Sequence, residues 1–317
     1  MFMEFHQKTQ TVRVPLKENP YSIRIGWDSL STIGAEVKKL KIGTDAVVMT
    51  SDVIYRLHGR ALTWSLKAAG LDVKVFRVPD GEKAKSAGLA MDLLEKVARH
   101  DVFKKIFVVA FGGGVVGDLA GFVAATYKRG VPYVQVPTTL LAQIDSSVGG
   151  KVAIDLPVGK NLVGAFYQPK LVLTDVKLLK TLDRRQIRNG LAEAVKYGVI
   201  DDPRLFDLLE KNTQKIFSLD PAVTLKMVKR CCEIKRDVVL ADEKETRGIR
   251  AILNFGHTVG HAIEAAGRFS VYQHGEAIAL GTRVAMDLSR ALNLCSQKTV
   301  DRVNGLLTDI GLPENMR

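Results

Sequence analysis

Two histidines, His257 and His261, stand four residues apart in the stretch FGHTVGHAIE, whose remaining residues predict a helix. Residues four apart lie on the same face of a helix, one turn from each other. A third histidine, His274, begins the next helical pattern. Three imidazoles, or two imidazoles and a carboxylate, with one position left open, form a catalytic zinc site. The spacing alone permits both helix histidines as metal ligands.

Glu193 is the candidate carboxylate, because its neighbours at positions 191, 192, 194 and 195 are apolar. A carboxylate partly buried among such residues needs a partner. An ion pair on the helix surface between Glu193 and Lys196, three residues along, is the alternative interpretation. Each histidine taken alone could also be a hydrogen-bonded packing residue.

A glycine-rich stretch, GGGVVGDLAGF, directly follows the apolar run KIFVVAF. Gly112, Gly114 and Gly117 match the pattern G-x-G-x-x-G between a predicted strand and a predicted helix. In that context backbone amides and the helix N-terminus bind a pyrophosphate, so the stretch predicts a dinucleotide site. A tight strand-to-helix turn is the alternative. The acidic residue expected about 20 positions further on is missing, since the chain there reads VPYVQVPTT.

Small polar residues fill the segment PTTLLAQIDSSVGGK over positions 137–151. They suit a loop at the carboxyl end of a strand, where open α/β sheets bind ligands. Lys151, Lys160 and Asn161 follow closely and could bind a phosphate, although such lysines are often only solvated.

The pattern of apolar residues predicts the elements that carry these groups. Strands are expected over 11–16, 21–25, 45–50, 73–78, 105–111, 131–136 and 171–174, with helices between them as at 86–100. The first two strands predict a hairpin, and the others predict a parallel sheet wrapped by helices. Only helical periods follow, over 184–199, 203–212, 221–241, 255–266, 275–292 and 297–310. We therefore expect an α/β Rossmann-like domain over 1–180 and an all-α domain over 181–317.

Composition excludes several classes of function. The net charge of +12 favours anionic partners, but no block of basic residues or interleaved aromatic platform indicates nucleic acid. Cys231, Cys232 and Cys295 form no Cys-x-x-Cys pair, which predicts reduced thiols. The start of the chain lacks a secretory signal and no apolar run reaches the ~20 residues of a membrane helix. We expect a cytoplasmic protein with no membrane or nucleic-acid partner.

Six segments together resemble the 3-dehydroquinate synthase family, one of the sugar phosphate cyclases. They occur in the order of the family and span almost the whole chain. The segments are DGEKAK over 80–85, GGGVVGDLAGFVAATYKRG over 112–130, QVPTTLLAQIDSSVGGKVAIDLPVGKNLVGAFYQP over 135–169, GLAEAVKYG over 190–198, RAILNFGHTVGHAIE over 250–264 and HGEAIALG over 274–281.

The resemblance implies a role for each matching residue. The metal ligands are Glu193, His257 and His274, for Zn²⁺ or Co²⁺, whereas His261 lies in the substrate site. The NAD contacts are Asp80, Gly81, Glu82, Lys83, Lys85, Gly114, Val115, Val116, Gly117, Asp118, Thr138, Thr139, Lys160, Leu178, Leu179, Lys180 and Thr181. The substrate and catalytic contacts are Arg129, Asp145, Lys151, Asn161, Lys196, Arg250, Asn254 and His261.

The family's reaction, which the resemblance implies here, converts 3-deoxy-D-arabino-heptulosonate 7-phosphate to 3-dehydroquinate. NAD takes a hydride and later returns it, phosphate leaves by elimination between these steps, and an aldol closure follows. The resemblance also implies a homodimer. The alternatives are another sugar phosphate cyclase, making an inosose or a valiolone, a metal-dependent dehydrogenase of the glycerol dehydrogenase type, or a non-catalytic binding protein.

Two departures from the family pattern affect the expected site. Family members usually continue beyond the position of Arg317 with an Asp-Lys-Lys segment whose lysine contacts the substrate phosphate. We therefore expect either an incomplete phosphate site or a shortened sequence. The run DEKETRGIR over 242–250 is one residue longer than usual, which leaves Glu245 without an assigned role.

Overall fold

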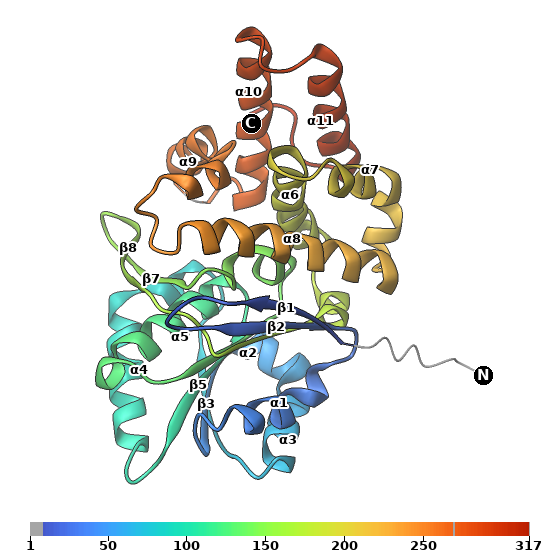
Figure 1. The fold of residues 1–317 in the computed structure, drawn as a ribbon. Helices are drawn as coiled ribbons and strands as arrows, with labels where there is room; N and C mark the ends of the chain where they lie inside the picture. The colour runs from blue at the N-terminus through green and yellow to red at the C-terminus, as the bar shows by residue number, and fades with distance from the viewer. Residues whose placement is uncertain (1–8, 269, 317) are drawn as a thin grey trace, which may run out of the picture. The chain divides into compact units, whose positions relative to one another are not determined.

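The computed structural model describes residues 9–268 and 270–316. The chain divides into two compact units, Met1–Thr181 and Leu182–Arg317. The first combines a sheet with helices, whereas the second is built from helices (Figure 1). The fold class expected from the sequence is confirmed.

A seven-stranded sheet in the order β1-β2-β9-β6-β5-β3-β4 forms the centre of the first unit. The antiparallel pairing of β1 with β2 confirms the predicted hairpin, and the other neighbours pair in parallel. The strands are β1 (Gln10–Val14), β2 (Tyr21–Gly26), β3 (Asp45–Ser51), β4 (Asp72–Val78), β5 (Ile106–Gly112), β6 (Tyr133–Pro137) and β9 (Leu171–Asp175). The helices and helical turns are η1 (Leu30–Thr32), α1 (Ile33–Leu40), α2 (Asp52–Ile54), η2 (Tyr55–Gly59), α3 (Arg60–Ala68), η3 (Glu82–Lys85), α4 (Ala87–His100), α5 (Gly114–Thr126), η4 (Tyr127–Arg129), η5 (Ala142–Ser146) and η6 (Val176–Thr181).

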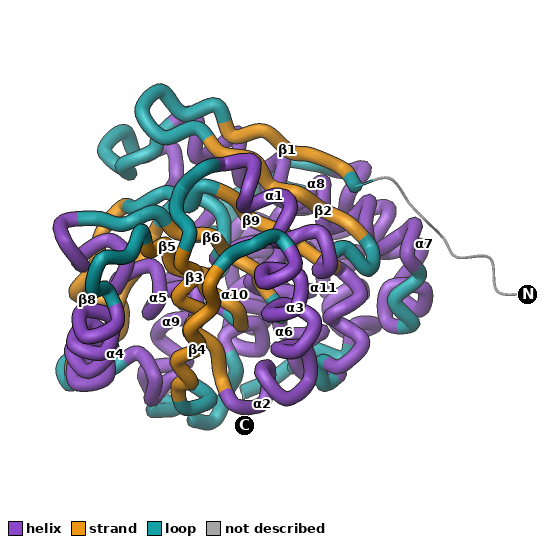
Figure 2. The backbone as a smooth tube through the Cα atoms, turned by 90° about the horizontal axis from the view of Figure 1, so that it is seen from below, coloured by secondary structure: helices purple, strands orange, loops and turns teal. Residues whose placement is uncertain are grey.

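Helices cover both faces of this sheet, with α4 and α5 on one face and α1 and α3 on the other (Figure 2). Side chains alternate between the faces along each strand. On β3, Val47 and Met49 pack in the core with α4 and α5, whereas Ala46 and Val48 pack in the core with α1 and α3. A strand buried on both faces requires a continuous apolar run, which is the pattern that predicted these strands.

The order of the strands reverses beside β5. The chain passes from β3 to β4 at one edge and then returns to β5 on the other side of β3. Open α/β sheets bind ligands outside the carboxyl ends of strands at such a switch point. Since β5 ends at Gly112, the glycine-rich stretch begins there. The reversal explains why this stretch follows a late strand of the chain instead of the first.

A two-stranded antiparallel hairpin, β7 (Lys151–Leu156) and β8 (Gly159–Phe166), lies outside the main sheet. Val152 and Ile154 of β7 are buried in the core that includes α5. The residues of β8 from Asn161 to Phe166 are all exposed. With both faces exposed, β8 shows no alternation of apolar and polar residues, and the sequence therefore did not predict this hairpin.

The second unit consists of helices close to those predicted, joined by short connections. They are α6 (Arg184–Ile200), α7 (Pro203–Phe217), α8 (Pro221–Ala241), η7 (Ile249–Asn254), α9 (His257–Ala266), α10 (His274–Ala291) and α11 (Gln297–Ile310). Asn212, where the predicted second helix ends, departs from helical geometry, but the helix continues to Phe217. Among the described residues, no helix is long and apolar enough to cross a membrane.

Candidate metal and nucleotide sites

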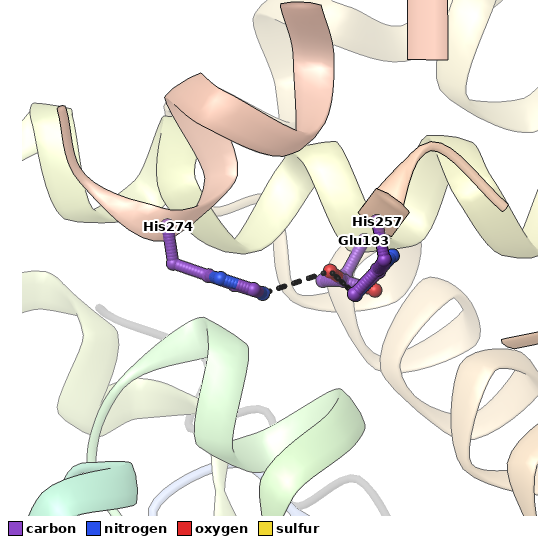
Figure 3. A group of neighbouring side chains, drawn as sticks. All are labelled: Glu193, His257 and His274. Carbon is purple, nitrogen blue, oxygen red and sulfur yellow. Dashed lines mark ion pairs between the residues drawn. The ribbon is translucent and has the colours of Figure 1, made fainter. Parts of the chain in front are cut away.

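Three side chains from different helices of the second unit converge on one point (Figure 3). Glu193 lies within α6, while His257 and His274 are the first residues of α9 and α10. Glu193 Oε1 lies 3.4 Å from the Nε2 atom of each histidine. One ligand atom of each residue lies within 4.8 Å of the others. The fold therefore assembles the carboxylate and two of the three histidines that the sequence singled out.

These separations suit a shared metal ion better than direct hydrogen bonds. Ligands held about 2.0–2.2 Å from a tetrahedral zinc ion are about 3.3–3.6 Å apart. A normal N–H to oxygen hydrogen bond is about 2.9–3.0 Å long. Glu193 Oε1 is buried and accepts no hydrogen bond of acceptable geometry from the described residues. The three groups thus fit the ligand set of a divalent metal with one further position for substrate or water.

The other nitrogen of each imidazole faces a hydrogen-bond acceptor. His257 Nδ1 lies 3.1 Å from the backbone oxygen of Phe255, and His274 Nδ1 lies 3.2 Å from Glu264 Oε2. When Nδ1–H donates to these acceptors, the lone pair of Nε2 points toward Glu193. Outer partners of this kind set the tautomer and orientation of histidines that bind metals.

Glu193 and Lys196 form an ion pair in which both side chains are almost fully buried. The alternative of a surface pair is therefore wrong. Burial raises the pKa of Glu193, but Lys196 and the two imidazoles outweigh it and hold the pKa well below its ordinary value. For His274, burial acts in the other direction and lowers the pKa of the imidazole. The carboxylates of Glu193 and Glu264 outweigh burial and raise this pKa to about 10. The ionised carboxylates make this point of the protein attractive to a cation.

His261 is placed differently from His257, although both lie on one face of α9. Its side chain is 62% exposed, and its Nε2 lies 4.0 Å from Glu264 Oε2. His261, Glu264 and His274 form a second group of possible ligands that shares His274 with the first. In that group the atom of His274 that faces Glu264 is Nδ1, at 3.2 Å. The structure thus distinguishes His257 from His261, which their spacing in the sequence did not.

Glycines allow the helices that carry the ligands to approach closely. A Cβ atom on Gly281 of α10 would lie 2.0 Å from the backbone oxygen of Gly256, the residue before His257. A Cβ on Gly275 would lie 2.2 Å from the backbone oxygen of Asn189 in α6. Asn189 also accepts a hydrogen bond from the Gly275 amide through its side chain. Only glycine fits at these two contacts, which hold α10 against α9 and α6.

A Gly281→Ala variant is expected to bind metal more weakly and to lose about 2 kcal/mol of unfolding free energy, within the range usual for an overpacked core. The added methyl group meets backbone atoms of α9, which must shift and take His257 with it. Zinc titration and thermal unfolding of the metal-free protein measure both effects. Gly305→Ala in α11 is the control, because nothing lies within 4 Å of its Cβ and alanine favours a helix interior. Equal zinc affinity in the two variants would contradict this positioning role.

In the first unit, the glycine-rich stretch leaves the N-terminus of α5 without a side-chain cap. The N-cap residue is Gly113, whereas Ser86 caps α4 by accepting from the amide of Leu89. The first amides of a helix have no partner within the helix and bind anions readily. The amides of Gly114, Val115 and Val116 therefore suit the pyrophosphate predicted from the sequence.

Lys85 joins three segments of the first unit through a buried ammonium group. It is only 3% exposed, and its Nζ lies 2.8 Å from Asp118 Oδ2 in α5. It also donates to the side chain of Asn161 in β8 and lies 3.9 Å from Asp155 in β7. Burial raises the pKa of Asp118, Lys85 partly offsets this, and the result is about 6. Lys85 thus connects the segment after β4, the helix of the glycine-rich stretch and the hairpin.

The remaining predicted contacts are distributed over both units. Leu178 and Leu179 are buried. Arg250 is buried and donates to the backbone oxygen of Glu243 at 2.9 Å, whereas Asn254 is exposed. Exposed or partly exposed residues of the first unit include Asp80, Gly81, Glu82, Lys83, Arg129, Thr139, Asp145, Lys151, Lys160, Lys180 and Thr181, while Thr138 is buried.

Sequence reasoning missed Glu264. This carboxylate is 8% exposed and contacts a predicted metal ligand. A signal was present, since residues 257, 261 and 264 follow the spacing of one helix face.

Comparisons with known proteins agree along nearly the whole chain. The 3-dehydroquinate synthase N-terminal family matches residues 75–189, and the 3-dehydroquinate synthase C-terminal family matches residues 190–317. The 3-dehydroquinate synthase of Thermoanaerobacter pseudethanolicus is 46% identical over 302 residues, which cover 95% of this chain and 85% of that protein. That of Desulforamulus reducens is 45% identical over 306 residues, which cover 96% and 85%.

The solved structures that share the fold include two synthases with bound NAD⁺ and a metal ion. The 2-epi-5-epi-valiolone synthase of Streptomyces hygroscopicus subsp. jinggangensis, with NAD⁺ and Zn²⁺ bound, has a TM-score of 0.86 and 26% identity, and the match covers 95% of this chain and 83% of that one. A 2-deoxy-scyllo-inosose synthase complexed with carbaglucose-6-phosphate, NAD⁺ and Co²⁺ has a TM-score of 0.83 and 25% identity, with 97% and 84% covered.

The matches to the solved structures and to both family descriptions assign the chain, with its α/β unit and its helical unit, to the sugar phosphate cyclase class of enzymes. The extent of the sequence identity then specifies the family. The chain belongs to the 3-dehydroquinate synthase family, whose activity is that of a lyase.

Proposed function

We propose that this enzyme converts 3-deoxy-D-arabino-heptulosonate 7-phosphate to 3-dehydroquinate and phosphate, a step of the shikimate pathway, with NAD and a divalent metal as cofactors. The observation that carries the proposal is the convergence of Glu193, His257 and His274 in a member of this family. Identity to the 3-dehydroquinate synthases is 45–46%, against 25–26% for the solved inosose and valiolone synthases. This difference favours the heptulosonate phosphate over the substrates of those enzymes.

The metal would be held by Glu193 and by Nε2 of His257 and His274. A bound Zn²⁺ or Co²⁺ supplies Lewis acidity, which polarises substrate oxygens and lowers the pKa of a hydroxyl. Lys196, buried beside Glu193, keeps that carboxylate ionised and ready to bind. Arg250 and Lys196 are fixed cations that would stabilise negative charge on the phosphate and on an enolate. His261, exposed beside the ligands, would contact the substrate.

NAD would bind at the carboxyl end of the sheet in the first unit, where it would take up and return one hydride. The uncapped amides at the start of α5 would hold the pyrophosphate, and Thr138 and Thr139 follow the neighbouring strand β6. In the family, Lys151 and Asn161 contact the substrate, and both lie on the hairpin that Lys85 connects to α5. A cytoplasmic homodimer is also part of this proposal.

With NAD and Zn²⁺ or Co²⁺, the purified protein is expected to release one phosphate for each 3-dehydroquinate formed, without net NADH. Phosphate release and dehydroquinate absorbance measure the products, and absorbance at the NADH band measures the cofactor. Chelator-treated protein is the control and should regain activity when metal is added. Steady NADH formation from a polyol would indicate a dehydrogenase instead. Phosphate release only from glucose 6-phosphate or sedoheptulose 7-phosphate would indicate another cyclase.

A further inference from the structure

We propose that Glu264 is a positioning residue for the metal site, holding the His274 imidazole so that Nε2 faces the metal. This inference rests on the metal site of the proposed function. Glu264 has no part in the predicted set of metal, NAD or substrate contacts. Its carboxylate faces Nδ1 of the His274 ring, whereas Glu193 faces Nε2.

The geometry supports this role directly. Glu264 Oε2 lies 3.2 Å from Nδ1 of His274, while the other ring nitrogen, Nε2, lies 3.4 Å from Glu193 Oε1. The ring is therefore held between two carboxylates. A carboxylate that accepts from Nδ1–H fixes the tautomer in which Nε2 carries the lone pair, and it makes that nitrogen a stronger donor to a metal.

Helix α9 places the Glu264 carboxylate close to two histidines, His274 and His261. Residues 257, 261 and 264 share a face of this helix. The same oxygen that contacts His274 lies 4.0 Å from Nε2 of the exposed His261. Glu264 is itself only 8% exposed, and Ile263 beside it packs in a small core with Ala277 and Leu280 of α10. The packing of α9 on α10 thus fixes the carboxylate beside the first residue of α10.

A direct ligand role for Glu264 is less favourable than positioning. A metal bound by His261, Glu264 and His274 would compete with the contact of His274 Nδ1 with Glu264. It would also leave the buried Glu193 Oε1, which lies 3.4 Å from two imidazoles, without a metal ion. His261 has a side chain that is 62% exposed, so this group is open to solvent on one side. The group that contains Glu193 satisfies the buried carboxylate and leaves Nδ1 to Glu264.

The test is a zinc titration against a competing chelator, with Co²⁺ absorption spectra as a second readout. We expect Glu264→Ala to bind one zinc per chain with about 10–100-fold lower affinity, the usual cost of losing an outer partner of a metal ligand. Glu264→Gln should recover most of the affinity, since its amide oxygen can still accept from Nδ1–H. The visible Co²⁺ bands should shift in the alanine variant and return toward those of the wild type in the glutamine variant.

Asp202→Ala is the matched control. Asp202 is 9% exposed, caps α7 and pairs with Arg230 in the same helical unit, so its loss should lower thermal stability without changing zinc affinity. Unchanged zinc affinity in Glu264→Ala, with stability alone reduced, would overturn the inference. Two zinc ions in the wild type and one in the alanine variant would show a ligand role and overturn it as well. Absence of zinc from the wild type would instead refute the proposed function.

Discussion

A His257→Ala variant is expected to lose stoichiometric zinc and, with it, more than about 100-fold in turnover, because loss of an outer partner alone costs 10–100-fold. His257 supplies one of three protein ligands and lies 3.4 Å from Glu193 Oε1. Without it, two protein ligands remain, and Glu193 stays buried beside Lys196 and a single imidazole. Metal content after gel filtration, measured by atomic emission, and the rate of phosphate release test the two effects.

The matched variant is His261→Ala, on the same face of α9 and one turn along. The exposed side chain of His261 has no place in the group that contains Glu193. This variant should therefore keep one zinc per chain and lose turnover through its contact with the substrate. Equal loss of zinc from both variants would contradict the assignment and favour a site that uses both histidines. Full activity of His261→Ala would remove it from the substrate contacts.

Local patterns in the sequence predict the types of ligand, and only the resemblance to the family selects among the histidines. Glu193 stood out because its neighbours are apolar, and the three histidines stood out because they cluster. Helical spacing treats His257 and His261 alike, since both point from one face. What separates them is the packing of α6 and α10 against α9, which depends on contacts such as Gly281 with Gly256. Such contacts join residues far apart in the chain, and no local pattern reports them.

In the fold, too, elements with a local sequence pattern were predicted, whereas features that depend on contacts between distant residues were not. Strands buried on both faces were predicted from continuous apolar runs, and helices from their period. The hairpin of β7 and β8 was not predicted, because β8 is exposed on both faces and its sequence carries no period. The buried ammonium of Lys85 was likewise invisible, since DGEKAK reads as a polar loop. Its burial follows from partners on α5 and on the hairpin.

The second large effect is expected for Lys85→Met, which should lower the unfolding free energy of the first unit by about 2–3 kcal/mol at pH 8. Breaking a buried ion pair costs about 3–5 kcal/mol, and the loss is smaller here because the Asp118 side chain keeps 22% exposure. Methionine preserves most of the volume, so the lost charge dominates. Urea unfolding without NAD measures the change, and hydrogen exchange should locate it in α5 and the hairpin.

The pH dependence separates an electrostatic effect from poor packing. In the wild type, burial raises the pKa of Asp118 to about 6, above its ordinary value of 3.8, so this group opposes folding increasingly as the pH rises from about 4 to 6. Removing Lys85 raises that pKa further. The variant should therefore lose more stability at pH 8 than at pH 5. At pH 8 the Asp118 carboxylate of the folded variant is either ionised without its partner or held protonated against the solution pH, whereas at pH 5 it is neutral.

The control, Lys96→Met, removes an exposed partner of Asp92 and should cost no more than about 0.5 kcal/mol at either pH. A loss for Lys85→Met as small as that of the control, or equal at both pH values, would show that the ammonium does not hold these segments together.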